Sequence, residues 1–166
     1  MTERRPFSIA ASNLKTADGS SIVRQGNTTV MCGIKLELAR PAAERPGQGF
    51  IVPNVTLPPM CSPAFKSGPP SPEAQTLSAF VKDVLNCAQC IDLDTLCPVP
   101  GKYAWVVYVD LVCLDHDGNL RDAVVAALMG ALASTKLPTV EYDADLDEIS
   151  VKPGKLNELI KWAWQR

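Results

Sequence analysis

The 166-residue sequence predicts a single α+β domain built from layers of sheet and helix. Three observations indicate this class: closely spaced strand-like runs in the first forty residues, two helical segments separated by one long strand, and a strand-like pair after the second helix. The content of 46% apolar and 20% charged residues is that of a globular protein, and the length is sufficient for a hydrophobic core.

Two short turns divide the first forty residues into three expected antiparallel strands. The turn at 16–19 (TADG) follows a strand at Phe7–Leu14. The turn at 25–27 (QGN) separates strands at Ser20–Arg24 and Thr28–Leu38. The pattern therefore favours a meander at the start of the sheet.

The segment that follows is rich in proline. Nine of the fourteen prolines lie between Pro41 and Pro72. Because proline breaks helices, we expect irregular loops here around one short strand at Gly49–Val55. Ordered loops of this length are often functional.

Two helices are expected, with the most apolar strand between them. The first, about Pro72–Cys90, begins with proline and has apolar residues at steps of three and four. The strand Tyr103–Leu114 is almost entirely apolar, which predicts that both its faces are covered and that Asp110 is buried, either paired or functional. Asn119 is expected to cap the second helix, Leu120–Ser134, whose apolar character on all sides predicts burial.

The end of the chain contains a strand pair and a divergent tail. Strands are expected at Leu137–Glu141 and Glu148–Val151. We expect residues 1–151 to form one domain and 152–166 to form a tail. Several apolar residues of this tail share one face of a short helix: Leu156, Leu159, Ile160, Ala163 and Trp164.

The charge distribution limits the classes of partner. The net charge of −2 excludes a strongly basic nucleic-acid binder. Residues 1–91 carry +3, residues 92–151 carry −8 and residues 152–166 carry +3, so only local contacts with nucleic acid are expected. No apolar run is long enough to span a membrane and the first residues lack the pattern of a secretion signal, which favours a soluble intracellular protein with no membrane partner.

Cysteine and histidine do not form a complete catalytic or metal-binding constellation in the sequence. Cys87 and Cys90 make a CxxC motif, but a structural zinc site needs four ligands and only Cys97 follows nearby. His116, the one histidine, lies in a turn between two aspartates. Structural free thiols and no metal are therefore expected, with metal binding and redox chemistry as the alternatives.

An ordered set of short motifs resembles the ribonuclease PH-like domains. The first motifs are ADGS at 17–20, GNTTV at 26–30 and CGIK at 32–35. VPNV at 52–55, LPP at 57–59, SGPP at 67–70 and DLVCLDHDGN at 110–119 narrow the resemblance to the non-catalytic ring subunits of the eukaryotic RNA exosome. The resemblance covers about residues 7–151.

This resemblance implies a fold, partners and a location. The implied fold is the layered sheet and helices of ribonuclease PH (ribosomal protein S5 domain 2-like). In that family, six such domains form a ring beneath cap subunits, and RNA is threaded through for 3′-to-5′ processing and degradation. The implied partners are other ribonuclease PH-like ring subunits, cap subunits and, weakly or indirectly, RNA. The implied location is the nucleus, nucleolus and cytoplasm, and no cofactor is implied.

The family pattern ends near Val151, so the resemblance implies an incomplete domain. A full domain of this family adds another set of strands and helices, which also carries the catalytic carboxylates. We therefore expect a truncated or alternatively spliced chain with no catalytic residues, in which residues 152–166 form a substitute end.

The resemblance also identifies a degenerate phosphate site. Catalytic members of the superfamily hold phosphate in a Gly-Gly-Thr-Arg-like turn at the start of the second helix, where this chain has GNLRD at 118–122. Arg121 falls on the phosphate-binding arginine, beside Asn119. Asp122 is expected to place a carboxylate where the phosphate would sit, which opposes anion binding at the helix N-terminus.

The sequence therefore favours a non-catalytic structural subunit that supports rRNA maturation and mRNA turnover. The alternative is a phosphate-dependent 3′-to-5′ exoribonuclease that uses Arg121. Candidate RNA contacts are Arg40, Arg45 and Lys66 on the proline-rich loops, whose alternative interpretation is ordinary solvated loop charges.

Overall fold

The computed structural model describes residues 5–41, 43–143 and 148–158. Nine elements lie in these ranges: β1 (Phe7–Ala11), β2 (Gly19–Gln25), β3 (Thr28–Ala39), β4 (Phe50–Thr56), α1 (Pro72–Ala88), β5 (Ala104–Asp115), α2 (Leu120–Ser134), β6 (Lys136–Asp143) and β7 (Glu148–Glu158). The α+β class and the order of the elements agree with the sequence prediction.

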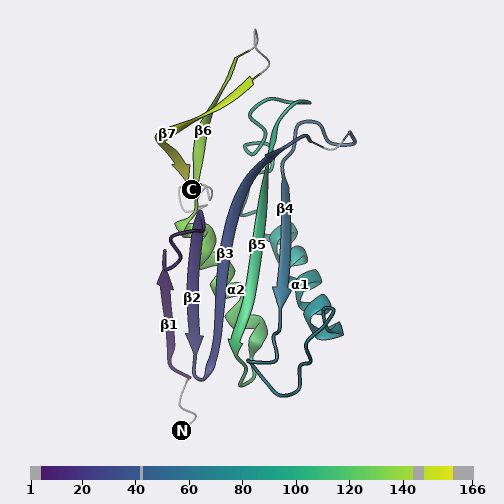
Figure 1. Cartoon of the computed structure of the whole chain (residues 1–166), viewed down its shortest axis with the longest axis vertical. Helices are drawn as coiled ribbons and strands as arrows, with labels where there is room; N and C mark the ends of the chain where they lie inside the picture. Colours follow the sequence, from purple (N-terminus) through teal and green to yellow (C-terminus); the bar gives the residue numbers. More distant parts are fainter. Residues whose placement is uncertain (1–4, 42, 144–147, 159–166) are drawn as a thin grey trace.

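The main sheet has five strands in the order β1-β2-β3-β5-β4 (Figure 1). The first three strands form the predicted antiparallel meander, and β5 pairs antiparallel with β3. Only β4 and β5 are parallel, because the chain crosses from one to the other through α1. The strands β1 and β4 are therefore the two edges of the sheet.

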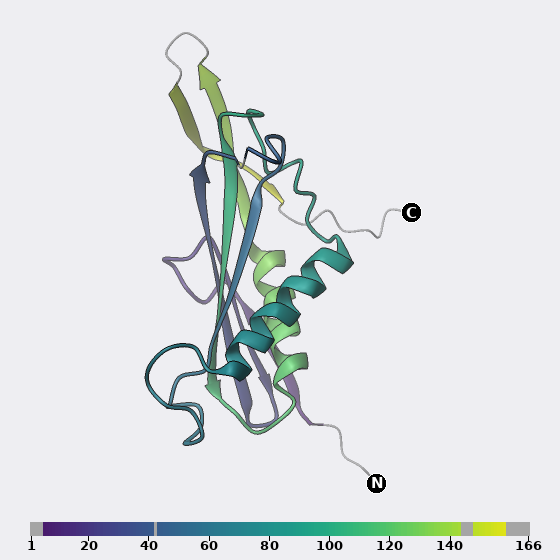
Figure 2. The same ribbon diagram turned by 90° about the vertical axis from the view of Figure 1, so that its right-hand side faces the viewer.

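Both helices cover the same face of the sheet (Figure 2). The Oγ atom of Ser71 accepts a hydrogen bond from the Ala74 amide at 3.2 Å, and Pro72 occupies the first turn of α1, so this helix begins where the sequence predicts. The buried side of α2 includes Ala123, Ala127 and Leu128. Small residues let α2 approach the sheet closely, and the buried Ser21 hydroxyl of β2 donates to the Ala127 carbonyl at 2.6 Å.

The strand β5, which lies between β3 and β4, is covered on both faces at its start, where Ala104 and Val106 are buried, but not at Tyr108 and Asp110, so the prediction is correct only in part. Val107, Val109 and Leu111 are fully buried under the helices. Tyr108 and Asp110 alternate with them and are exposed on the opposite face, since successive side chains of a strand point to opposite sides. Asp110 is therefore not a buried carboxylate, and it accepts a 3.3 Å hydrogen bond from the amide of Asn54 on β4.

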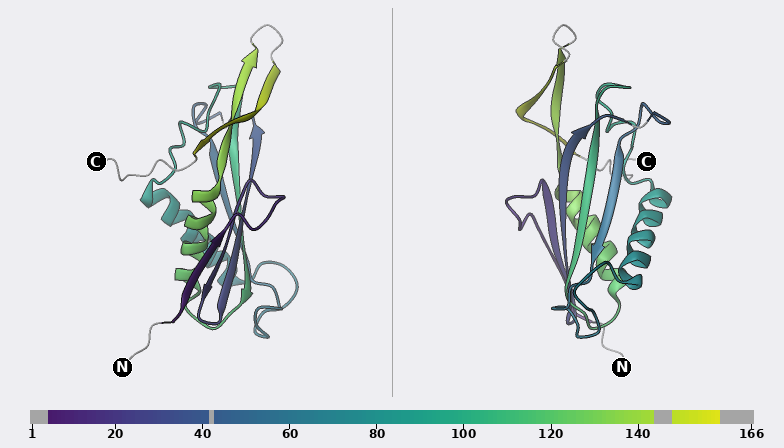
Figure 3. Two further views of the ribbon diagram at one scale, coloured as in Figure 1. Left: turned by 90° about the vertical axis from the view of Figure 1, so that its left-hand side faces the viewer. Right: turned by 45° about the vertical axis from the view of Figure 1, so that its right-hand side comes forward.

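The strands β6 and β7 form a separate two-stranded sheet that projects from one end of the main sheet (Figure 3). β7 is longer than predicted and continues through the expected boundary between residues 151 and 152. Leu156, Asn157 and Glu158, where we expected the start of the tail helix, are thus extended and paired with β6. The rest of the expected tail, residues 159–166, lies outside the described residues.

Three of the cysteines, Cys32, Cys61 and Cys113, are buried in the core. Burial raises the pKa of the Cys32 and Cys113 thiols from 9.0 to about 12. Cys87, in contrast, is exposed on α1. Because the thiolate is the reactive form, these raised pKa values lower the reactivity of Cys32 and Cys113.

We expect iodoacetamide at pH 8.5 to alkylate Cys87 in the folded protein and to leave Cys32 and Cys113 unmodified. A pKa near 12 in place of 9.0 lowers the thiolate fraction about a thousandfold, in addition to steric protection. Peptide mass spectrometry before and after unfolding in urea measures the difference, and Cys87→Ser is the control. Rapid labelling of Cys32 in the folded chain would contradict the packing of β3.

Candidate functional site

The turn between β5 and α2 has two residues in the left-handed conformation. Gly118 has φ 79° and Asn119 has φ 53°. Asn119 is the N-cap residue of α2, as predicted, but in this conformation its side chain makes no capping hydrogen bond. The first turn of α2 is instead connected to Asn119 through its backbone carbonyl, which accepts from the Ala123 amide at 3.5 Å.

Two side chains from distant parts of the chain hold this turn in place. Thr28, fully buried at the start of β3, donates from Oγ1 to the Gly118 carbonyl at 2.7 Å and accepts from the Asp117 amide at 3.0 Å. Arg5 donates from Nη1 to the Asp117 carbonyl at 2.8 Å. The turn that leads into α2 is therefore held by a residue before β1 and by the first residue of β3.

A cavity of about 310 Å³ lies between the starts of α1 and α2. Its polar lining residues are Glu73, Thr76, His116, Asn119 and Arg121. The uncapped N-terminus of α2 would favour an anion here, because helix N-termini present free amides and a positive dipole end. The Glu73 carboxylate in the same cavity acts in the opposite direction by repelling an oxyanion.

Arg121 and Asp122 lie in different surroundings at the start of α2. The Arg121 guanidinium is stacked over the Phe80 ring of α1, 5.5 Å from its centroid, which is a cation–π arrangement. Asp122 is exposed and is not among the residues that line the cavity. The structure thus brings Asn119 and Arg121 together with Glu73 at this cavity, and it leaves Asp122 outside the cavity lining.

The three candidate RNA contacts do not form one surface. Arg40 and Arg45 lie in the connection between β3 and β4, at one end of the sheet. Lys66 lies between β4 and α1, at the opposite end, which is the end near the α2 N-terminus (Figure 1). All three side chains are exposed.

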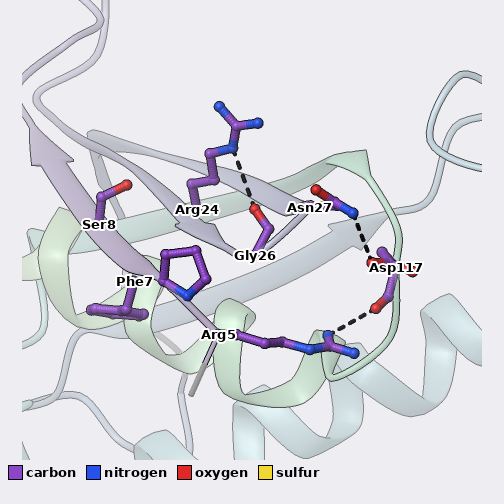
Figure 4. Close-up of a pocket in the computed structure, with 8 residues that line it drawn as sticks. Arg5, Phe7, Ser8, Arg24, Gly26, Asn27 and Asp117 are labelled. Carbon is purple, nitrogen blue, oxygen red and sulfur yellow. Dashed lines mark hydrogen bonds between the residues drawn. The ribbon is translucent and has the colours of Figure 1, made fainter. Parts of the chain in front are cut away.

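A second cavity, of about 560 Å³, opens at the start of β1 (Figure 4). Arg5, Phe7, Arg24 and Asp117 line it, together with residues of the β2–β3 turn. Asn27 donates from its amide to Asp117 Oδ2 at 3.1 Å, and Arg24 Nε donates to the Gly26 carbonyl at 3.4 Å. Arg5, Phe7 and Arg24 are not among the site residues predicted from the sequence. The signal that could have found them is the uncharged run at 7–14, which follows two arginines.

In the part of the chain that the structure describes, no set of side chains is arranged to bind a metal ion. No group of three His, Cys, Asp or Glu side chains is close enough there to hold a metal ion. The Cys97 thiol donates to the Tyr103 carbonyl at 3.5 Å rather than joining the CxxC pair. Likewise, no described helix has the length and apolar character needed to cross a membrane.

Comparison with known proteins identifies relatives over most of the chain. Residues 3–138 match the 3′ exoribonuclease family, domain 1. The chain is 43% identical to exosome complex component rrp43 of Schizosaccharomyces pombe, covering 90% of this chain and 55% of that protein. It is 40% identical to exosome complex component Rrp42 of Methanopyrus kandleri, covering 94% of this chain and 60% of that protein.

Solved structures of exosomes also contain chains that are similar to this one. The structure of the Archaeoglobus fulgidus exosome with RNA bound to the active site contains a chain of 35% identity, which aligns with a TM-score of 0.79 over 90% of this chain and 59% of that one. A chain of an archaeal exosome core aligns with a TM-score of 0.72 at 30% identity. The present chain thus spans little more than half of the length of its relatives.

Proposed function

The chain belongs to the 3′ exoribonuclease family, and on this premise we propose that it is a non-catalytic structural subunit in the ring of an RNA exosome. The relatives that support this proposal carry the name of exosome component, and the similar solved structures are exosome cores. Its partners would be other ribonuclease PH-like ring subunits and cap subunits. Its work would be rRNA maturation and mRNA turnover in the nucleus, nucleolus and cytoplasm.

The cavity between α1 and α2 is the observation that supports a subunit without catalytic activity. Phosphorolysis needs an orthophosphate ion, and the Glu73 carboxylate lies in the cavity that this ion would enter. The one arginine of this cavity is held over the Phe80 ring. Both features lower the affinity of the cavity for an oxyanion.

A phosphate-dependent 3′-to-5′ exoribonuclease is the second candidate function. It is favoured by Arg121, which lines the cavity beside the uncapped N-terminus of α2. Arg40, Arg45 and Lys66 remain proposed RNA contacts for either function. Because they lie at two ends of the sheet, they would contact separate parts of an RNA strand.

Two measurements on one preparation test this proposal. The tagged full chain, expressed together with exosome ring subunits, is expected to co-purify with them. Labelled single-stranded RNA incubated with the purified chain and orthophosphate is expected to remain intact, with no release of nucleoside diphosphate. Phosphorolysis that is abolished by Arg121→Ala would establish the enzyme instead, and failure of the chain to co-purify would exclude the ring subunit.

A further inference from the structure

We propose that the free edge of β1 is a docking site for an extended β-strand of a neighbouring ring subunit, one with acidic side chains where it passes Arg5 and Arg24. This inference rests on the proposed function, because it assigns one surface of this chain to a ring neighbour. It concerns a different part of the molecule from the cavity between the helices.

The backbone of β1 provides the first argument. β1 is an edge strand, and all five of its residues are exposed (Figure 1). The Gly26 amide donates to the Pro6 carbonyl at 2.8 Å, and the Ser12 amide donates to the Ser20 carbonyl at 2.7 Å. Because hydrogen bonding alternates along an antiparallel pair, Ser8 and Ala10 face β2, whereas the amides and carbonyls of Phe7, Ile9 and Ala11 face outward.

The side chains of the same residues provide the second argument. Phe7 is 56% exposed and Ile9 is 48% exposed, and both lie on the same face of the strand. Edge strands of soluble proteins are normally protected by lysine, proline or a bulge, and β1 has none of these. The other edge, β4, carries Pro53, so the two edges are not equivalent.

Two arginines beside β1 indicate the charge of the strand that would dock there. Arg5 and Arg24 border the cavity at the start of β1, and within the described residues they donate hydrogen bonds to backbone carbonyls (Figure 4). Among the described residues, neither guanidinium is paired with a carboxylate, and Asp117, the one acid that lines the cavity, bonds to Asn27. Two cations against one carboxylate favour an acidic ligand, and guanidinium groups pair with carboxylates in a bidentate manner.

The phosphates of single-stranded RNA could pair with the two arginines, but RNA would not match the exposed backbone and apolar side chains of β1. A row of outward amides and carbonyls beside exposed apolar side chains matches the main chain and alternate side chains of another strand, which is the known mode of strand addition. RNA presents no such alternating pattern of donors and acceptors. The observations therefore favour a polypeptide strand over RNA.

The test is hydrogen exchange on the full chain, alone and in the complex with its co-purifying ring subunits. In the complex, the amides of Phe7, Ile9 and Ala11 are expected to exchange more slowly by about tenfold or more, while Ser8 and Ala10 change little. Equal exchange in both states would overturn the proposal. Protection by added single-stranded RNA, and not by the ring subunits, would overturn it in favour of RNA.

Substitutions at the edge supply the second measurement. Ile9→Lys adds an edge charge and is expected to weaken binding to ring subunits about tenfold or more. Arg24→Ala is expected to weaken it by about two- to fivefold, and less at high salt. Lys82→Ala removes the same charge from an exposed position on α1 and serves as the matched control.

The outcomes separate the two proposals. If the wild-type chain does not bind ring subunits, the proposed function fails. If the wild type and the Ile9→Lys variant bind equally well, the docking site fails and the proposed function stands. Because Ile9 and Arg24 are exposed, an unchanged circular dichroism spectrum is expected to show that these variants fold.

Discussion

Replacing Gly49 with alanine is expected to destabilise the protein by about 2–3 kcal/mol, which lowers the melting temperature by about 4–12 °C. A β-carbon at this position would lie 2.5 Å from Cβ of Leu96 and 2.6 Å from the carbonyl oxygen of Trp105. Neither neighbour can give way easily, because Leu96 is fully buried and the Trp105 carbonyl belongs to β5. The Gly49 amide also donates to the Leu93 carbonyl at 3.0 Å, so a backbone shift would break a hydrogen bond.

Gly47→Ala is the matched control for this substitution. Gly47 is two residues away in the same loop, yet no atom lies within 4 Å of the position that its β-carbon would occupy. We expect a change of less than about 0.5 kcal/mol, since a surface alanine in an allowed conformation adds no clash and restricts the unfolded chain slightly. Urea unfolding followed by circular dichroism measures both variants. Equal stabilities would show that the loop does not pack on Leu96.

Single proline and glycine residues in the sequence predict correctly where several helices and strands begin. Pro72 in the first turn of α1 and the turn at Gly26, whose φ is 63°, place the helix and the β2–β3 hairpin where the structure has them. Proline and glycine have few alternatives in conformation, so their positions are informative without knowledge of the tertiary contacts. The parallel pairing of β4 with β5 has no such local signal, because it depends on the path of the chain through α1.

The directions of the Asp110 and Asp122 side chains could not be predicted from the sequence. Asp110 is predicted to be buried and is exposed, and Asp122 is exposed outside the lining of the cavity that Arg121 lines. Whether a side chain points to one side of a strand or helix depends on which face meets its neighbour, and an element that is apolar all round does not reveal that face. Thr76 and Arg121 line the cavity and Asp122 does not, because successive residues of a helix point in different directions.

The place of β1 at the edge of the sheet likewise could not be predicted from the sequence. Phe7–Leu14 is recognisable as a strand from its sequence, and its lack of charged residues is visible there. An uncharged strand is ordinary in the centre of a sheet and unusual at an edge. The order of the strands in the sheet is needed to see that this strand is an exposed apolar edge. The roles proposed for Arg5 and Arg24 depend on the same information.

Replacing Thr28 with valine is expected to have the other large effect, about 2–4 kcal/mol of lost stability. Valine matches threonine in shape, but it removes the hydroxyl that bonds to both the Gly118 carbonyl and the Asp117 amide. Because Thr28 is fully buried, the Asp117 amide would lose its partner and the Gly118 carbonyl would lose a strong donor.

Thr28→Ser keeps this hydroxyl and loses only a methyl group, so its expected cost is about 1 kcal/mol. Chemical denaturation compares the two variants, and hydrogen exchange at the Asp117 amide reports the local change. Since Thr28 holds the turn that precedes α2, the valine variant is expected to accelerate this exchange well before global unfolding, whereas the serine variant is not. If valine and serine cost the same, the hydroxyl does not hold the turn, and the position of α2 must depend on helix packing alone.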